Sequence, residues 1–231
     1  MTDPVRLGSA LFTLVEPHRG HEVAYNRWYE RDHFYAGCMV GPWLFAGRRW
    51  VATRALKDLR TGSEADVFGD RDLGSYLAIY WIIEGRHDDH TAWALQQVHG
   101  LHAAGRMFAE RDHVHTLLYR FTKAVSSEVD GVPPELALDH PYEGLVAALV
   151  PRGAPLDEPR GGLRLEFEPI PLPDDAPVSQ VGLDDLDRKA LQLTFLDHAP
   201  EADDVPADGV LWGAPFIPTV PGTDRYTDEL W

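Results

Sequence analysis

The sequence of 231 residues contains only one cysteine, Cys38, and no apolar stretch that approaches the ~18 residues a membrane-spanning helix needs. A single thiol cannot form a disulfide within the chain or build a zinc site from cysteines. The first residues, Met-Thr-Asp-Pro-Val-Arg, lack the apolar core of a signal peptide. We therefore expect a cytoplasmic protein without a membrane partner.

Several common motifs are also missing. The chain has no Gly-x4-Gly-Lys-Ser/Thr loop, no Gly-x-Gly-x-x-Gly after a predicted strand and no Gly-x-Ser-x-Gly turn. The formal net charge of −16 opposes binding to phosphate backbones, because that affinity comes from clustered Lys and Arg. These absences disfavour nucleotide-dependent transfer, Rossmann-type redox chemistry, serine hydrolysis and nucleic-acid partners.

Charge, proline and histidine are distributed unevenly along the chain. Residues 1–127 hold 15 basic and 15 acidic side chains, 3 prolines and 9 histidines. Residues 128–231 hold 6 basic and 22 acidic side chains, 15 prolines and 2 histidines. These shifts predict a neutral domain over 1–127, a linker over 128–144 and an acidic, proline-rich half over 145–231.

The neutral part alternates between strand-like and helix-like segments. Strands are predicted over 10–16, 43–53, 76–83 and 113–121, and helices over 20–34 and from about 88 to 108. This β-α-β-β-α-β order is that of a ferredoxin-like unit. The second helix should bury a stripe of Ala94, Val98, Leu101, Gly105 and Phe108.

The acidic half shows strand-like runs over 144–150, 163–169, 191–196 and 210–217, with no helix longer than two turns. It is either a degenerate copy of the first unit or an extension that packs on it. The sequence therefore predicts an α+β protein in which a ferredoxin-like unit and a helix-poor, strand-rich half form an α+β barrel.

The leading candidate site lies on the first helix. At helical spacing Asn26, which is the only asparagine, shares one face with Tyr29 and His33. A neutral imidazole can exchange a proton with a substrate, and the Tyr29 hydroxyl and the Asn26 amide can orient a developing oxyanion. One of Arg48 and Arg49 must point inward because strand neighbours alternate, and it can hold an enolate or a carboxylate. The alternative is that these aromatic residues are core and that the helix dipole alone favours His33.

This combination resembles the dimeric α+β barrel superfamily and is nearest to its EthD-like group. The resemblance rests on Asn26-x-Trp28-Tyr29-x3-His33, on the turn Gly41-Pro42 and on the strand with Arg48-Arg49, and it covers about residues 8–125. It implies ferredoxin-like units that pair into a barrel, across a homodimer or between the two halves of the chain. It also implies a small hydrophobic substrate between sheet and helices. Because the superfamily includes varied chemistries, fold membership does not assign the reaction.

We therefore predict a homo-oligomeric small-molecule enzyme without a nucleotide cofactor. It would perform acid/base chemistry of the isomerase, cyclase, lyase or monooxygenase type on an aromatic or carbonyl-bearing substrate. The first alternative is a non-catalytic binding protein for a hydrophobic metabolite, which a pocket without a pKa-matched group would favour. The predicted catalytic residues are His33, Tyr29, Asn26, Arg48 and Arg49, and the predicted substrate-binding residues are Trp28, Tyr35, Trp43 and Trp50.

The remaining histidines offer a second candidate site. His87, His90, His99 and His102 lie on the second predicted helix, and His113 and His115 should share one face of the strand that follows. Imidazoles in such an arrangement suit a transition metal or haem. No cysteine pair, His-Glu-x-x-His motif or compact carboxylate cluster supports this site. We therefore predict no resident cofactor, with a haem- or metal-dependent enzyme as the second alternative.

Overall fold

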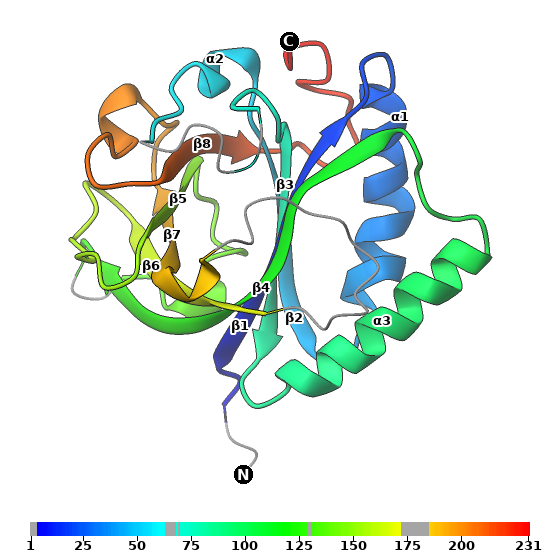
Figure 1. Cartoon of the computed structure of the whole chain (residues 1–231), viewed down its shortest axis with the longest axis horizontal. Coiled ribbons are helices and arrows are strands. Elements are labelled where there is room, and N and C mark those ends of the chain that lie inside the picture. The colour runs from blue at the N-terminus through cyan, green and yellow to red at the C-terminus, as the bar shows by residue number, and fades with distance from the viewer. Residues whose placement is uncertain (1–3, 63–67, 69, 129–130, 172–184) are drawn as a thin grey trace.

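Eight antiparallel strands form one closed barrel in the computed structural model, which describes residues 4–62, 68, 70–128, 131–171 and 185–231 (Figure 1). The strand order around the barrel is β1-β3-β2-β8-β5-β7-β6-β4. The strands are β1 (Leu7–Pro17), β2 (Leu44–Val51), β3 (Tyr76–Ile83), β4 (Arg111–Ser126), β5 (Gly144–Pro151), β6 (Leu163–Ile170), β7 (Lys189–Leu196) and β8 (Trp212–Pro218).

The longer helices lie outside the barrel, beside the strands of the first half (Figure 1). They are α1 (Glu22–Trp28), which continues as the π-helix η1 (Tyr29–Met39), and α3 (His87–Ala103). The remaining helical segments are α2 (Arg54–Lys57) and the 3-10 turns η2 (Pro134–Leu136), η3 (Leu186–Arg188) and η4 (Ala202–Asp204). Among the described residues, no helix has both the length and the apolar character required to span a bilayer.

The predicted fold class was wrong: the architecture is a closed antiparallel β-barrel and not a set of ferredoxin-like α+β units. Strand β4 has 16 residues, whereas the sequence predicted a strand over 113–121 only. Its first part pairs with β1, and Leu118–Ser126 pair with β6, so the sheet of the first half continues into the second. Strand β8 pairs with β2 on the other side. The barrel therefore closes within one chain, and a β-barrel replaces the α+β barrel that the sequence predicted.

The barrel interior is filled by large aromatic side chains. Along β3 the side chains alternate, so that Ile79 and Trp81 face the interior and Ala78 and Tyr80 face the helices. All but the last residue of this strand are buried, as its uniformly apolar sequence predicts. The aromatic residues of the interior include Phe12, Trp50, Trp81, Tyr119, Phe167, Phe195 and Phe216.

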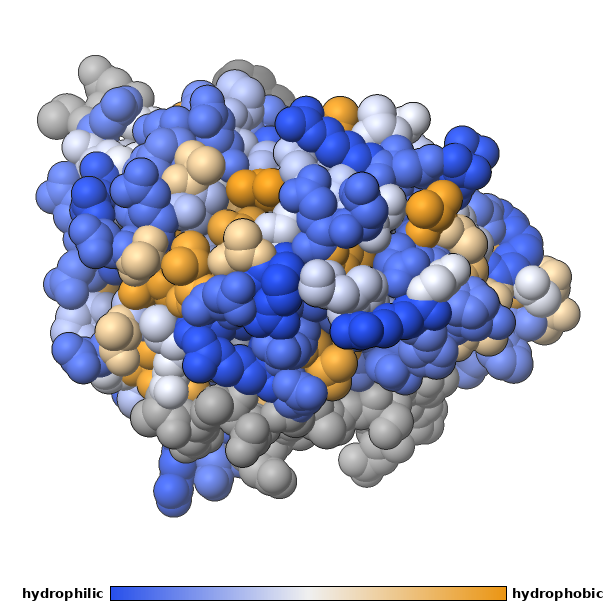
Figure 2. Space-filling model, turned by 90° about the horizontal axis from the view of Figure 1, so that it is seen from above, coloured by the Kyte–Doolittle hydropathy of each residue, from blue (hydrophilic) through white to orange (hydrophobic). Residues whose placement is uncertain are grey.

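Residues 219–231 return from β8 and pack against α1 and α2. The backbone N–H of Thr219 donates to the carbonyl of Arg49 (3.2 Å), and the indole N–H of Trp231 donates to the carboxylate of Glu22 (2.8 Å). Seen from above, the end of the molecule that carries α2 and this segment presents a largely hydrophilic surface with scattered apolar patches (Figure 2). The segment thus ties the last strand to the helices of the first half.

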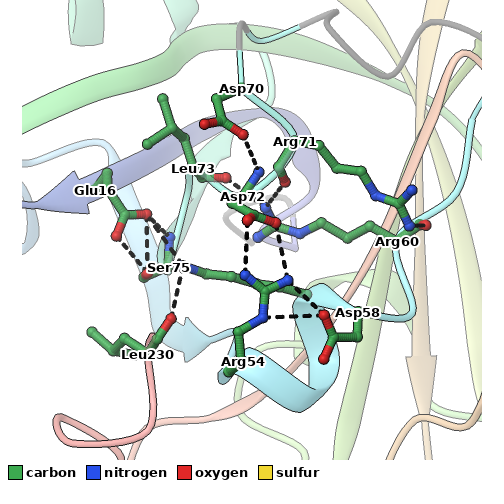
Figure 3. Close-up of polar contacts among 11 residues, drawn as sticks. Glu16, Arg54, Asp58, Arg60, Asp70, Arg71, Asp72, Leu73, Ser75 and Leu230 are labelled. Atoms are coloured by element: carbon green, nitrogen blue, oxygen red, sulfur yellow. Dashed lines mark hydrogen bonds and ion pairs between the residues drawn. The ribbon is translucent and has the colours of Figure 1, made fainter.

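A buried polar cluster secures the top of the barrel (Figure 3). The carboxylate of Glu16, at the end of β1, accepts hydrogen bonds from the backbone N–H and the hydroxyl of Ser75 (both 2.7 Å). The ammonium of Lys57 lies 3.7 Å from this carboxylate and donates to the carbonyl of Leu230 (3.1 Å). Burial raises the pKa of Glu16 and lowers that of Lys57 to about 8. The buried charges of Glu16 and Lys57 therefore stabilise each other.

The substitution Lys57→Met should destabilise the protein by about 3–5 kcal/mol, because it leaves the Glu16 carboxylate buried without its cation. The double variant Glu16→Gln/Lys57→Met should regain most of that loss, since no uncompensated charge remains. Urea unfolding of the two single variants and the double variant measures both effects. Additive destabilisation in the double variant would show that the pair is not coupled.

Candidate functional site

A cavity of about 830 Å³ lies between the outer face of the barrel and the helices η1 and α3. Its floor is formed by outward-facing residues of β1 and β4, and its walls by η1, α3 and the connection that follows α3. The residues on which the chemistry depends are Tyr29, His33, His90, Arg111, His113 and Thr116.

Helix α3 packs against η1 and meets the sheet at its first turn, and the cavity lies between these elements. The ring of Trp93 packs so closely against Gly41 that a Cβ atom there would lie 2.8 Å from it. The side-chain amide of Gln97 donates to the carbonyl of Ala36. Of the stripe that the sequence predicts to be buried, Leu101 is buried, whereas the other members line the cavity. The apolar face of α3 therefore forms a wall of the cavity.

The change from α-helix to π-helix at Tyr29 decides which side chains reach the cavity. Its i→i+5 hydrogen bonding gives a wider turn, and π-helical segments occur frequently at functional sites. Tyr29 and His33 line the cavity, whereas Asn26, which precedes the change, faces elsewhere. At Gly37 a Cβ atom would lie 2.9 Å from Cε1 of His33, so only glycine accommodates the imidazole in this position.

The imidazole of His33 is held by aromatic contacts and has an unpaired nitrogen. It stacks on the ring of Trp28 at 4.5 Å between centroids with an interplanar angle of 21°. Its Nδ1 atom is buried without a hydrogen-bond partner in the described structure. Burial lowers the pKa of His33 to about 3, with smaller contributions from the charge of Arg111 and from His113. His33 is therefore neutral at physiological pH.

Arg111 and His113 form a hydrogen-bonded pair on β4. A guanidinium only donates, so Nε2 of His113 accepts from Nη2 of Arg111 (3.3 Å). The proton of the neutral imidazole then lies on Nδ1, which donates to the hydroxyl of Thr116 (2.9 Å). Burial and the nearby guanidinium lower the pKa of His113 to about 4. This imidazole is also neutral at physiological pH and orients the guanidinium.

The positive charge of Arg111 is not neutralised by a carboxylate. Its guanidinium lies 4.9 Å from the ring centroid of Trp28, and burial lowers its pKa. The neighbouring Asp112 pairs with His18 (3.2 Å). Among the described residues, no carboxylate forms an ion pair with Arg111, so this charge is available to a ligand in the cavity.

Neutral proton-bearing groups, Tyr29 and Cys38, line the cavity on the side of η1, and Tyr80 lies behind them. The hydroxyl of Tyr29 lies 2.9 Å from that of Tyr80, which also contacts the thiol of Cys38. Burial raises the pKa of both tyrosines well above the ordinary value and that of Cys38 to about 12. These three groups keep their protons at physiological pH and can act only as hydrogen-bonding groups.

Two of the predicted catalytic residues lie outside the cavity and hold the chain together. The guanidinium of Arg49 donates to the side-chain oxygen of Asn26 (2.9 Å) and to the carboxylate of Glu30 (3.1 Å). The amide of Asn26 donates to the carbonyl of Thr223 (2.8 Å), and Glu30 accepts from the backbone N–H of Gly222 (2.9 Å). This network fastens residues 219–224 to α1.

Arg48 points to the opposite side of β2, as alternation along the strand requires. Its guanidinium donates to the carbonyls of His140 (2.5 Å) and Tyr142 (3.0 Å) and lies 4.5 Å from the ring centroid of Trp50. It therefore secures the segment before β5 to the end of the barrel.

The aromatic residues predicted to bind substrate serve other purposes. Trp50 is buried inside the barrel, and Trp43 lies under the guanidinium of Arg86. Tyr35 is 55% exposed. Trp28 lies behind the cavity wall, where it supports the ring of His33.

The expectation that His113 and His115 share one face was wrong. A β-bulge shifts the register between β1 and β4 at this point, so that Leu14 pairs with His115 and Val15 with His113. His113 lines the cavity, whereas His115 lies inside the barrel, where its Nε2 is 2.7 Å from the hydroxyl of Tyr119. Within the described part of the chain, no group of three His, Cys, Asp or Glu side chains is placed to hold a metal ion.

Sequence reasoning did not identify Arg111 as a site residue, and it considered His90 and His113 only as metal ligands. The sequence pattern that would reveal the cavity residues of β4 is weak. The bulge interrupts the alternation that would place Arg111, His113 and Thr116 on one face. Comparison with known proteins adds no assignment, since no protein-family model and no curated protein matches this chain.

Stability should fall as the pH is lowered from 6.5 towards 4. In this window an unfolded chain protonates His113, whose ordinary pKa is 6.5, whereas the folded protein, with a pKa of about 4, does not. The variant His113→Asn should therefore lose about 1–3 kcal/mol less stability between pH 7 and pH 4.5 than the parent protein. Urea unfolding at the two pH values measures this difference, and an equal loss in both proteins would contradict the assignment.

Proposed function

We propose that the protein binds a small, largely apolar molecule that carries an anionic oxygen group, such as a carboxylate, in the cavity between α3 and the barrel. The observation that carries this proposal is the guanidinium of Arg111, which lines the cavity without an acidic partner among the described residues. A guanidinium forms strong, geometrically defined hydrogen bonds with carboxylates.

The remaining lining supports an apolar ligand body. Leu11, Val98, Met107 and Phe108 contribute apolar surface, and the cavity volume lies within the range of small-molecule sites. The neutral histidines add hydrogen-bonding groups without adding charge. Asp112 also lines the cavity, but its carboxylate pairs with His18, so the guanidinium of Arg111 remains for one anionic group on a hydrophobic body.

Binding without catalysis agrees best with the protonation of the cavity. A general acid or base works best when its pKa lies near the operating pH. The pKa values of His33 and His113 are about 3 and 4, and those of Tyr29 and Cys38 lie far above neutrality. We therefore place the binding function ahead of the predicted acid/base enzyme.

The substitution Arg111→Met should weaken binding of a hydrophobic carboxylate, with dodecanoate as the probe, by about 10–100-fold, because the charge-assisted hydrogen bonds are lost. Dodecan-1-ol, which has the same apolar body without the charge, should bind the variant and the parent protein equally. Isothermal titration calorimetry at pH 7.5 measures both affinities.

The control variant is Arg120→Met, which removes an exposed arginine from the same strand. Its affinity for dodecanoate should equal that of the parent protein. Equal weakening by both substitutions would indicate a general charge effect and would refute Arg111 as the anion site.

Acid/base catalysis is the second candidate function, and one observation favours it. His33 has an unpaired ring nitrogen and lines the same cavity as Arg111, whose charge helps to keep the imidazole neutral. An anion bound at Arg111 would offset that charge and raise the pKa of the imidazole. For a carboxylate that is also turned over, His33→Gln should abolish turnover and change its affinity less than twofold. Retained turnover in single-turnover assays would exclude His33 as the base.

A further inference from the structure

We propose that the ligand is elongated and carries a second, uncharged oxygen group, a hydroxyl or a carbonyl, which lies against His90 at the end of the cavity opposite Arg111. This inference rests on the proposed binding function and specifies the chemical class of the ligand.

The two polar ends of the cavity are fixed by the register of the sheet. Arg111 pairs with Pro17 at the end of β1, whereas Ser9, near its start, pairs with Arg120. Nδ1 of His87 lies 3.2 Å from the hydroxyl of Ser9, which places the first turn of α3 at that start. His90 and Arg111 therefore lie at opposite ends of the cavity.

The length of the cavity follows from its walls. His90 and His102 both line it and are twelve residues apart on α3, which corresponds to roughly 18 Å along a helix axis. Ala94 and Val98 lie between them and present small apolar surfaces, and the imidazole of His99 lines the same stretch. A cavity of this length matches an extended molecule better than a compact one.

His90 provides the polar group at the far end. The residue lines the cavity but is only 2% exposed, and its Nδ1 atom is buried without a hydrogen-bond partner in the described structure. Its ring neighbours are Trp93, at 6.0 Å between centroids, and His87 of the same helix. Buried polar atoms in native proteins are nearly always satisfied, so an unpaired imidazole nitrogen beside a cavity indicates a ligand atom.

The second group must be uncharged. Burial lowers the pKa of His90 to about 4, so the imidazole is neutral at physiological pH and offers a hydrogen bond without charge. A carboxylate would be solvated poorly there and would prefer Arg111. The two ends therefore orient the ligand, with its anionic group at β4 and its neutral oxygen at α3.

The test compares dodecanoate with 12-hydroxydodecanoate, and the corresponding pairs with 8 and 16 carbons, by titration calorimetry on the full chain. At the length that spans the cavity, the ω-hydroxyl should strengthen binding by about fivefold, because it satisfies the buried nitrogen. At the shorter length the hydroxyl should give no such gain, since it does not reach His90.

The variant His90→Phe should remove the fivefold gain and leave the affinity for the plain acid within twofold. The variant His90→Gln, which keeps a hydrogen-bonding group, should retain part of the gain, and it guards against a folding defect in the first variant. Gln96→Phe, which alters an exposed residue of the same helix that does not line the cavity, is the control and should retain the full gain.

The outcomes separate the two proposals. If the plain acids bind through Arg111 but no ω-hydroxy acid binds more tightly, the inference about His90 is overturned and the binding function stands. A gain that persists in His90→Phe also overturns it. If no acid binds, the proposed function fails, and this inference fails with it.

Discussion

The pairing of β4 with two different strands is the interaction on which the rest of the structure depends. Its first ten residues pair with β1 and its last nine with β6, with an overlap of three residues at Leu118–Arg120. A strand of this length links the sheets of the two halves, and the closed barrel leaves no open sheet edge. The same strand begins with Arg111 and His113, so the element that closes the barrel also carries the polar end of the cavity.

The electrostatics of the cavity depend on one partly buried cation. The guanidinium of Arg111 holds its charge, and this charge opposes protonation of His33 and His113, both already disfavoured by burial. Three basic side chains thus share one positive charge. A ligand anion would be attracted to that charge and, once bound, would lower the cost of protonating its neighbours. An anion bound at this site would therefore favour proton uptake by these neighbours, a property that three separate arginines would not have.

The sequence predicted local elements well and their long-range pairing poorly. The second-half strands were predicted at 144–150, 163–169, 191–196 and 210–217, within two residues of the observed bounds. The alternation of apolar residues carries that information. It does not state which strands are neighbours, because β4 and β6 meet across about 40 residues and no local pattern encodes that contact. The prediction of the fold class was therefore wrong, although the sequence located most of the individual strands.

The candidate site shows the same division. Helical spacing brought Tyr29 and His33 to notice, and both line the cavity. It also grouped Asn26 with them, because an α-helical period was assumed where the structure turns into a π-helix. Arg49 was predicted as a catalytic residue because of its charge, but in the structure its guanidinium forms an ion pair with Glu30. Contacts of this kind depend on residues 219–224, which lie about 200 positions away from the helix motif and give no signal in its neighbourhood.

The bond between Asn26 and Thr223 has a consequence for folding kinetics. It joins positions 197 apart, so the helix that leads into the cavity acquires its anchor only after almost the whole described chain is in place. Contacts of such large sequence separation pay their loop-closure entropy early and slow the folding of small domains. The barrel closes through the pairing of Trp50 with Pro218, so both the barrel and the anchor of this helix need residues from the end of the described chain.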